Sequence, residues 1–191
     1  MCGRYHLERD DASLEEIMAL LQRGGAKQMK TSGEIAPTDT VPVIARNRRG
    51  EPGVFAMRWG YATDGGLVIN ARSESAHTKA LFADGMKQRR CLIPASHYYE
   101  WEQRGKERIR YAIRPTGSGL VYLAGLYRLC DAKGSAEFVI LTRDAAQDVA
   151  FIHPRMPVML PGQTHASWLN PQVDGRAALD EALLRMNYGA A

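Results

Sequence analysis

The chain has 191 residues, of which 45% are hydrophobic and 24% are charged, and its formal net charge is +4 at pH 7. This balance is typical of a soluble globular protein with one sizeable core. No run of eighteen apolar residues occurs, and charges from Arg4 onward interrupt any signal-peptide core, so we expect neither a membrane span nor a leader. The mild positive charge is compatible with a polyanionic partner.

The first half of the chain is expected to contain short strands and two helices. A capping-box pattern at Ser13, followed by apolar residues at helical spacing up to Leu21, predicts a surface helix. Strands are expected over residues 41–45, 54–59 and 67–71, and a short helix over 75–82.

The second half is richer in strands. They are expected over residues 91–94, 98–102, 108–114, 120–129, 137–142 and 158–160. A helical turn is expected over 144–149, and helices over 163–169 and 176–186. About eight strands with short helices between them, and no repeat or linker, predict a single α+β domain over residues 1–191.

The cysteines are Cys2, Cys91 and Cys130, an odd number of widely spaced residues with no C-x-x-C motif. This pattern argues against a disulfide framework and against a zinc cluster. It is typical of a reducing compartment, and we expect a cytoplasmic protein that needs no metal.

The amino terminus, Met1-Cys2-Gly3-Arg4, carries the most distinctive chemistry. Removal of Met1 would leave Cys2 with an α-amine and a thiol on adjacent carbons, and both groups have reactive fractions near neutral pH. The amine condenses with an aldehyde to a Schiff base, and the thiol then adds to the imine carbon to close a thiazolidine ring. The alternative is that Cys2 is an ordinary buried small hydrophobe.

Three further residues are candidates for proton transfer or positioning. Glu100 shares a strand face with Tyr98 and Glu102, and an inward face would suit it to acid–base catalysis, whereas an outward face would leave it an exposed glutamate. His153 lies in a Pro-rich bend that can hold its imidazole at a fixed angle, which favours a proton-transfer role, whereas a histidine on its own is more often a structural hydrogen-bonder. Asn70, at a strand end, is suited to orient an amine or a sugar hydroxyl, or else to form a turn.

Arginine and aromatic side chains recur in a pattern compatible with nucleic-acid binding, although most charge runs are solvated surface. Trp59, Tyr61 and Trp101 are candidates to stack on bases, and arginines are candidates to pair with phosphates. These arginines are Arg4, Arg46, Arg48, Arg49, Arg72, Arg89, Arg90, Arg104, Arg108 and Arg110.

Seven motifs follow one another in an order that resembles a known family. They are Met1-Cys2-Gly3-Arg4, Ala36-Pro37-Thr38, Arg58-Trp59-Gly60, Asn70-Ala71-Arg72-Ser73-Glu74, Arg90-Cys91-Leu92-Ile93-Pro94-Ala95, Tyr98-Tyr99-Glu100-Trp101 and His153-Pro154-Arg155-Met156-Pro157. Each motif is weak alone, but seven in order are a specific signal. From residue 1 to about 160, the chain resembles the SRAP (SOS-response-associated peptidase) family.

The resemblance implies a mixed, mainly antiparallel, barrel-like β core with short flanking helices. It implies a protein that binds single-stranded DNA and crosslinks to abasic sites, with Cys2 as the nucleophile after self-removal of Met1. Asn70 would position the α-amine, Glu100 would act as acid–base catalyst, and His153 would assist sugar ring opening, proton transfers and reversal. The DNA-binding residues it implies are Arg4, Pro37, Trp59, Arg72 and Arg155.

The resemblance also sets expectations for cofactors, partners and location. It implies no cofactor and no metal, and single-stranded DNA with abasic sites as the partner of a monomer. We expect a cytoplasmic protein that associates with the nucleoid on DNA damage. Two features depart from the family: Glu34 replaces the usual asparagine, and the chain ends at Ala191, sooner than many members. A carboxylate at position 34 would repel phosphate if it faced the DNA, and a shorter tail bears on DNA contacts and on closure of the β core.

Three other function classes remain open on the residues alone. Glutamine amidotransferases also use an amino-terminal cysteine, but they need an Arg-Gly-Pro-Asp-like segment that this chain lacks. A non-catalytic single-strand-binding module would use the basic and aromatic residues without Cys2. A general cysteine protease using Cys2 and His153 is disfavoured, because cleavage of one's own first bond needs no groove for other proteins.

Overall fold

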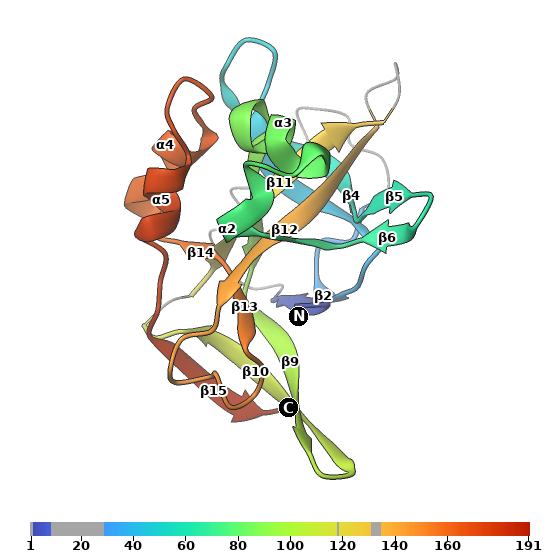
Figure 1. Ribbon diagram of the computed structural model, residues 1–191, viewed down its shortest axis with the longest axis vertical. Helices are drawn as coiled ribbons and strands as arrows, with labels where there is room; N and C mark the ends of the chain where they lie inside the picture. Colours follow the sequence, from blue (N-terminus) through green and yellow to red (C-terminus); the bar gives the residue numbers. More distant parts are fainter. Residues whose placement is uncertain (1, 9–28, 118, 131–134) are drawn as a thin grey trace.

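The computed structural model describes residues 2–8, 29–117, 119–130 and 135–191 (Figure 1). The helix expected from Ser13 lies outside the described residues. Strands dominate, and the short helices lie at the periphery, so the fold is the mixed α+β class that the sequence predicts.

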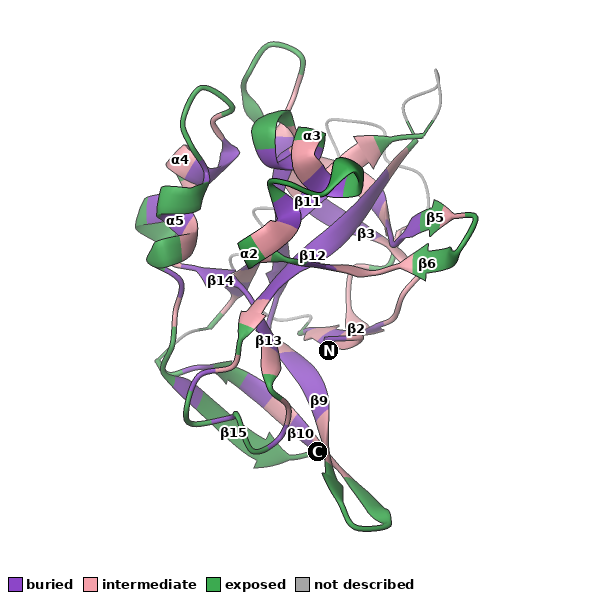
Figure 2. Ribbon diagram, in the orientation of Figure 1, coloured by how far each residue is buried: buried purple, intermediate pink, exposed green. Residues whose placement is uncertain are grey.

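The larger sheet closes on itself, because β12 pairs with β4 on one side and with β11 on the other. The ring runs β12–β4–β3–β8–β11 and returns to β12, with antiparallel pairs except between β12 and β4. These strands are β3 (Thr40–Arg46), β4 (Pro52–Trp59), β8 (Arg90–Ala95), β11 (Val121–Leu129) and β12 (Ala136–Asp144). The expected barrel-like core is therefore present, and Figure 2 shows β12 buried along most of its length.

A second, five-stranded sheet lies beside the ring in the order β15-β10-β9-β1-β2. Its strands are β1 (Arg4–Leu7), β2 (Gly33–Ile35), β9 (His97–Arg104), β10 (Glu107–Pro115) and β15 (Met186–Ala190). The β9–β10 hairpin extends away from the body, with an exposed tip (Figure 2). Because β1 lies between β9 and β2, the amino terminus is held inside the sheet rather than at its edge.

The remaining elements are short and lie around these two sheets. The strands are β5 (Tyr61–Thr63), β6 (Gly66–Val68), β7 (Asn70–Arg72), β13 (Arg155–Pro157) and β14 (Met159–Leu160). The helices are α2 (Ser73–Ala76), α3 (Ala80–Gln88), η1 (Gly162–Thr164), α4 (His165–Leu169) and α5 (Arg176–Asp180). Both β7 and β13 pair with β12, so the residues that β7 and β13 carry are positioned by the same strand.

Two helix predictions were wrong in their bounds. The helix expected over 75–82 is two helices, α2 and α3, separated by a turn. The helix expected over 176–186 ends at Asp180, and Met186 instead begins β15, which pairs with β10 over five residues. Main-chain pairing at the sheet edge and burial of Met186 outweigh the weak local helical pattern.

The buried side chains form two clusters. One lies inside the ring and under the five-stranded sheet, and it includes Cys2, Trp59 and Met156. The other lies outside the ring beneath the helices and includes Phe82 and Trp168. Among the described residues, no helix is long and apolar enough to cross a membrane.

Candidate functional site

Cys2 lies immediately before β1 and is completely buried. The ladder pairs Arg4 with Tyr99, so the same register continued outward brings Cys2 alongside the segment of β9 that carries Glu100. The thiol makes only a weak contact, with Sγ donating to the carbonyl oxygen of Arg4 at 3.8 Å. Burial, and secondarily the charge of Glu100, raises the pKa of the Cys2 thiol to about 12.

Asn70 reaches Cys2 from the opposite side of the site. Its Nδ2 donates a hydrogen bond of 2.9 Å to the carbonyl oxygen of Cys2, and its backbone is fixed by parallel pairing of β7 with Ile140 on β12. The side-chain oxygen Oδ1 is buried, and among the described residues it has no hydrogen-bond partner. A buried acceptor of this kind is suited to receive a donor such as the free α-amine of Cys2.

Glu100 faces inward, as one of the two readings of its strand predicted. Its side chain is buried at 5% exposure, on the same face of β9 as Tyr98. Its charge acts on the thiol of Cys2 strongly enough to be the second cause of the raised thiol pKa. The structure therefore brings Cys2, Asn70 and Glu100 together in one buried place.

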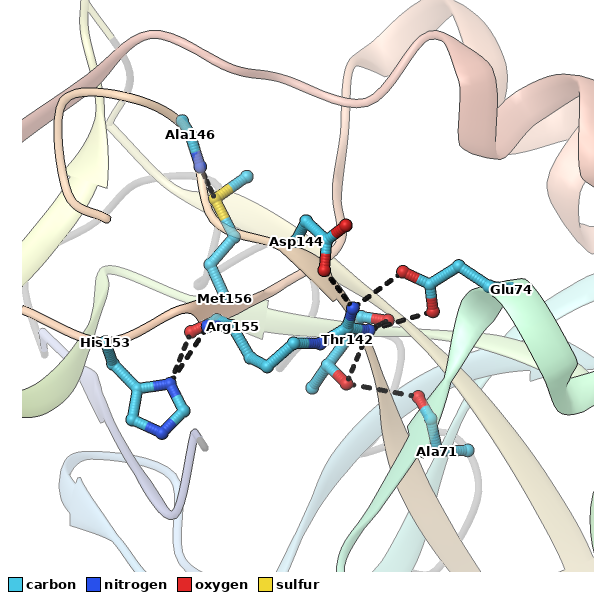
Figure 3. A network of polar contacts seen from close by, with 8 residues as sticks. All are labelled: Ala71, Glu74, Thr142, Asp144, Ala146, His153, Arg155 and Met156. Carbon is cyan, nitrogen blue, oxygen red and sulfur yellow. Dashed lines mark hydrogen bonds and ion pairs between the residues drawn. The ribbon is translucent and has the colours of Figure 1, made fainter. Parts of the chain in front are cut away.

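His153 lies in the loop before β13. Its Nδ1 accepts a hydrogen bond of 2.9 Å from the backbone N–H of Arg155, an arrangement that fixes the ring as the bend predicted (Figure 3). The same Nδ1 lies 3.1 Å from the carbonyl oxygen of Arg155, so its role as acceptor or donor depends on the tautomer. The loop is tied to the site through the core, because Ile152 and Met156 pack in the same cluster as Cys2.

Arg155 was predicted to bind DNA, but its guanidinium is engaged inside the protein (Figure 3). Its side chain is 14% exposed, with Nη1 at 2.7 Å from Glu74 and 2.6 Å from Asp144. Its Nη2 donates to Glu74 and to the carbonyl oxygen of Thr142 at 2.7 Å. This network ties α2 to β12 and β13, and so supports the loop that carries His153.

Trp59 was predicted to bind DNA, but its side chain lies inside the protein. The indole is completely buried, packs against Tyr5 and Phe138, and donates from Nε1 to the carbonyl oxygen of Ile69 at 3.0 Å. The neighbouring Gly60 has φ of +107°, which only glycine adopts readily, and this turn lets the strand end with its aromatic ring inside.

Two other DNA-binding candidates lie at the surface. Arg72 is exposed at the end of β7, two residues after Asn70. Pro37 is half-buried in a tight turn whose next residue, Thr38, has φ of +79°. A β-branched residue in the left-handed region is strained, and such strain is concentrated at functional sites.

Arg4 is half-exposed and is bound to the residue that departs from the family pattern. Its Nε lies 3.2 Å from Oε1 of Glu34, while Oε2 of Glu34 lies 2.5 Å from Nη2 of Arg110. The hydrogen bond from Arg110, followed in effect by the charges of Arg110 and Arg4, lowers the pKa of Glu34. Arg110 was named in the sequence only among many arginines, and no motif singled it out.

No metal centre emerges from the described part of the chain, where no three His, Cys, Asp or Glu side chains gather into a group suited to hold an ion. The three cysteines are free thiols, with Cys91 buried and Cys130 exposed. The candidate site is thus an amino-terminal thiol beside an amide and a carboxylate, within a small sheet-dominated fold.

The SRAP family model, described as SOS response associated peptidase, matches residues 1–190, and the chain belongs to this family. A curated relative from Bacillus subtilis, named abasic site processing protein YoqW, is 31% identical over 187 residues. That alignment covers 90% of this chain and 81% of the relative. Abasic site processing protein YedK from Escherichia coli is 26% identical, with 95% of this chain and 85% of the relative covered.

Solved structures share the fold. A phage-related protein from Bordetella bronchiseptica superposes with a TM-score of 0.78 at 22% identity, covering 100% of this chain and 94% of that one. A protein from Bacteroides thetaiotaomicron gives a TM-score of 0.73 at 21% identity, covering 99% and 91%. At this identity the likeness establishes the architecture alone.

Proposed function

We propose that this chain captures abasic sites in single-stranded DNA as a covalent thiazolidine formed by Cys2 after loss of Met1. The observation that carries the proposal is the meeting of Cys2 with the Asn70 amide and the Glu100 carboxylate in one buried place. Membership of a family whose curated relatives are named abasic site processing proteins supports the substrate.

The first step frees the amine. Water hydrolyses the Met1–Cys2 peptide bond, and Glu100 is the nearby carboxylate suited to activate that water. Asn70 holds the carbonyl of Cys2 during this step through its Nδ2. Its buried Oδ1 then accepts a hydrogen bond from the new α-amine. An asparagine fixed on β7 thus orients the nucleophile both before and after the cleavage.

The second step joins protein to DNA without any oxidant or reductant. The amine of Cys2 attacks the aldehyde carbon of the ring-opened sugar, and loss of water gives a protonated imine. The thiol then adds: its sulfur bonds to that carbon, and its proton ends on the nitrogen after the π electrons move there. Glu100 and His153 carry protons in these steps, and His153 assists opening of the sugar ring.

The DNA requirement follows from the lesion itself. An abasic sugar has no base to unstack or unpair, so bringing it to a small buried site costs less than flipping an intact nucleotide. Arg4, Arg72 and the turn at Pro37 lie on the described surface and are the candidates to hold the flanking backbone. Binding of this kind has low sequence preference and falls with salt.

One gel tests the proposal. The protein is incubated with a single-stranded oligonucleotide carrying one abasic site, boiled in detergent and separated by electrophoresis. We expect a shifted band with the wild type, none with Cys2→Ala, and an unchanged band with Cys130→Ala, which alters an exposed thiol. Absence of the band in the wild type, or its persistence in Cys2→Ala, would contradict the proposal.

Three further measurements test the proposal and separate the alternatives. Mass spectrometry of the purified protein should show loss of Met1, since a blocked amine cannot form the ring. Release of ammonia from glutamine would instead favour an amidotransferase. DNA binding that survives Cys2→Ala and leaves no detergent-resistant complex in the wild type would favour a non-catalytic module.

A further inference from the structure

The outer face of the five-stranded sheet carries cations and aromatic rings on neighbouring strands. Because Arg4 pairs with Tyr99 and Arg110 pairs with Trp101, these four side chains point to the same side of the sheet. Glu100, between Tyr99 and Trp101, points to the opposite, buried side. The outer face therefore lies on the same strands that position the candidate site.

Glu34 on β2 holds two of these cations at once. Arg110 reaches Oε2 at 2.5 Å and Arg4 reaches Oε1 at 3.2 Å, so each carboxylate oxygen is paired with a different guanidinium. The three side chains remain in contact with solvent, at 39% exposure for Arg4, 40% for Glu34 and 29% for Arg110. A carboxylate bridged in this way occupies the place that an oxyanion with two free oxygens would take.

The two arginines are held in place by contacts that do not involve Glu34. The guanidinium of Arg110 lies over the ring of Tyr99, 3.6 Å from its centroid. The guanidinium of Arg4 donates from Nη1 to the carbonyl oxygen of Gly3 at 2.7 Å. Departure of the carboxylate would therefore leave a preorganised pair of cations.

We propose that Arg4 and Arg110 form a phosphodiester site that Glu34 fills in the free protein and yields when DNA binds. This inference rests on the proposed function, since it names how the DNA backbone is held beside the Cys2 site. Glu34 thereby determines how tightly the protein binds intact DNA, and it leaves durable attachment to the covalent step. Arg110 becomes a DNA-binding residue that the sequence motifs did not include.

The physical consequence is a change in both affinity and salt dependence. Each phosphate neutralised by a protein cation releases condensed counterions, which makes binding weaken as salt rises. A carboxylate already paired with the arginines acts as an internal counterion, so the exchange for phosphate yields less net free energy. Removing its charge restores the full contribution of both guanidinium groups.

The experiment measures non-covalent binding to an intact dye-labelled oligothymidylate by fluorescence anisotropy, over a range of salt concentrations. Without an abasic site, the thiazolidine chemistry does not enter. We expect Glu34→Gln to bind about three- to tenfold more tightly at low salt, with a log–log salt slope steeper by about 0.7 for each arginine released. Glu107→Gln alters an exposed glutamate at the start of β10, so it is the matched control and should match the wild type.

A double-mutant cycle tests the role of Arg110. We expect Arg110→Gln to weaken binding more in the Glu34→Gln background than in the wild type, because only there is the guanidinium fully available. Thermal unfolding of each variant verifies that the fold is intact. Equal affinity and equal slope for Glu34→Gln and wild type would overturn the proposal, as would a loss from Arg110→Gln that is the same in both backgrounds.

The outcomes also separate this inference from the proposed function. A wild type that crosslinks abasic DNA while Glu34→Gln leaves intact-DNA binding unchanged refutes the phosphate site and leaves the covalent function standing. Tighter binding by Glu34→Gln, without any crosslink in the wild type, supports the phosphate site and refutes the covalent function.

Discussion

Cys2 and Cys91 are both completely buried thiols, but the regions around them differ in character. Cys91 lies on β8 inside the barrel-like ring, so close to β11 that a Cβ on Gly125 would come within 3.0 Å of its sulfur. Burial alone raises the pKa of the Cys91 thiol. Cys2 has the same burial, but Glu100 is the second cause of its shift and Asn70 holds its carbonyl. The comparison teaches that burial is common to both thiols, and that of the two only Cys2 combines it with a neighbouring carboxylate and an amide.

The largest expected effect is on the rates at which the two thiols are alkylated. With Met1 in place, we expect Cys2 to react with iodoacetamide on the order of 1,000-fold more slowly than a free thiol at pH 8. A pKa of about 12 in place of 9.0 lowers the thiolate fraction at that pH by about the same factor. Loss of Met1 places an ammonium beside the thiol and should speed Cys2 but not Cys91. Peptide mass spectrometry measures both sites, with urea-unfolded protein as the control. Equal acceleration of Cys91 would remove the distinction between the two regions.

The two residues proposed to carry protons should give the next largest effect. We expect Glu100→Gln and His153→Ala each to slow crosslinking to abasic DNA by a factor on the order of 100, the low end of acid–base contributions. Glu102→Gln is the matched control, because Glu102 lies two residues along the same strand but bonds to Tyr111 and Arg104. Single-turnover gel kinetics measure the rates. Variants as fast as the wild type would exclude those two residues from the mechanism.

Alkaline pH should reveal what the two thiols share. Their pKa values are raised in the folded state, so above pH 9 the unfolded chain loses protons that the folded chain keeps. This contribution to the free energy of unfolding is complete below pH 9 and falls by about 1.4 kcal/mol per pH unit per thiol as the pH rises toward 12. Urea unfolding at pH 8, 9 and 10 should show a shallower decline in Cys2→Ala and in Cys91→Ala. An unchanged decline in both would mean that the thiols are not buried as described.

Relief of backbone strain at Thr38 should give the smallest effect. Thr38, at φ of +79°, donates its backbone N–H to Trp59, which packs in the same cluster as Cys2. We expect Thr38→Gly to raise the free energy of unfolding by about 1 kcal/mol, since glycine adopts this conformation without strain. Thr40→Gly, in extended backbone on β3, is the control and should lower it. A Thr38→Gly variant less stable than the wild type would show that the turn is unstrained.

Local patterns predicted the parts of the site that depend on strand period and motif order. The alternation of residues around Glu100 left an inward-facing side chain as one of two possibilities, and in the structure Glu100 is buried. The order of motifs singled out Cys2 and Asn70, and a hydrogen bond joins these two residues. The same motifs also predicted that the chain belongs to the SRAP family, and the family match confirms it.

Contacts between distant residues could not be predicted in this way. Glu34 and Arg110 are 76 positions apart, and only the β2–β1–β9–β10 order brings their side chains together. Trp59 looked available for stacking because an aromatic residue at a strand end has no local sign of which way it turns. The strand at Met186–Ala190 forms because it pairs with the open edge of β10. Its own residues carry no pattern that predicts this pairing.

The position of β1 between β2 and β9 has a consequence for the timing of synthesis. β1 pairs with β9, which ends at Arg104, and the Asn70 that bonds to Cys2 is positioned by β12, which ends at Asp144. Until β12 has emerged, Cys2 lacks both the Glu100 carboxylate and the positioned Asn70 amide, so the proposed self-processing of Met1 lacks the groups assigned to it. The chemistry proposed for Cys2 therefore becomes possible only after most of the chain has been synthesised.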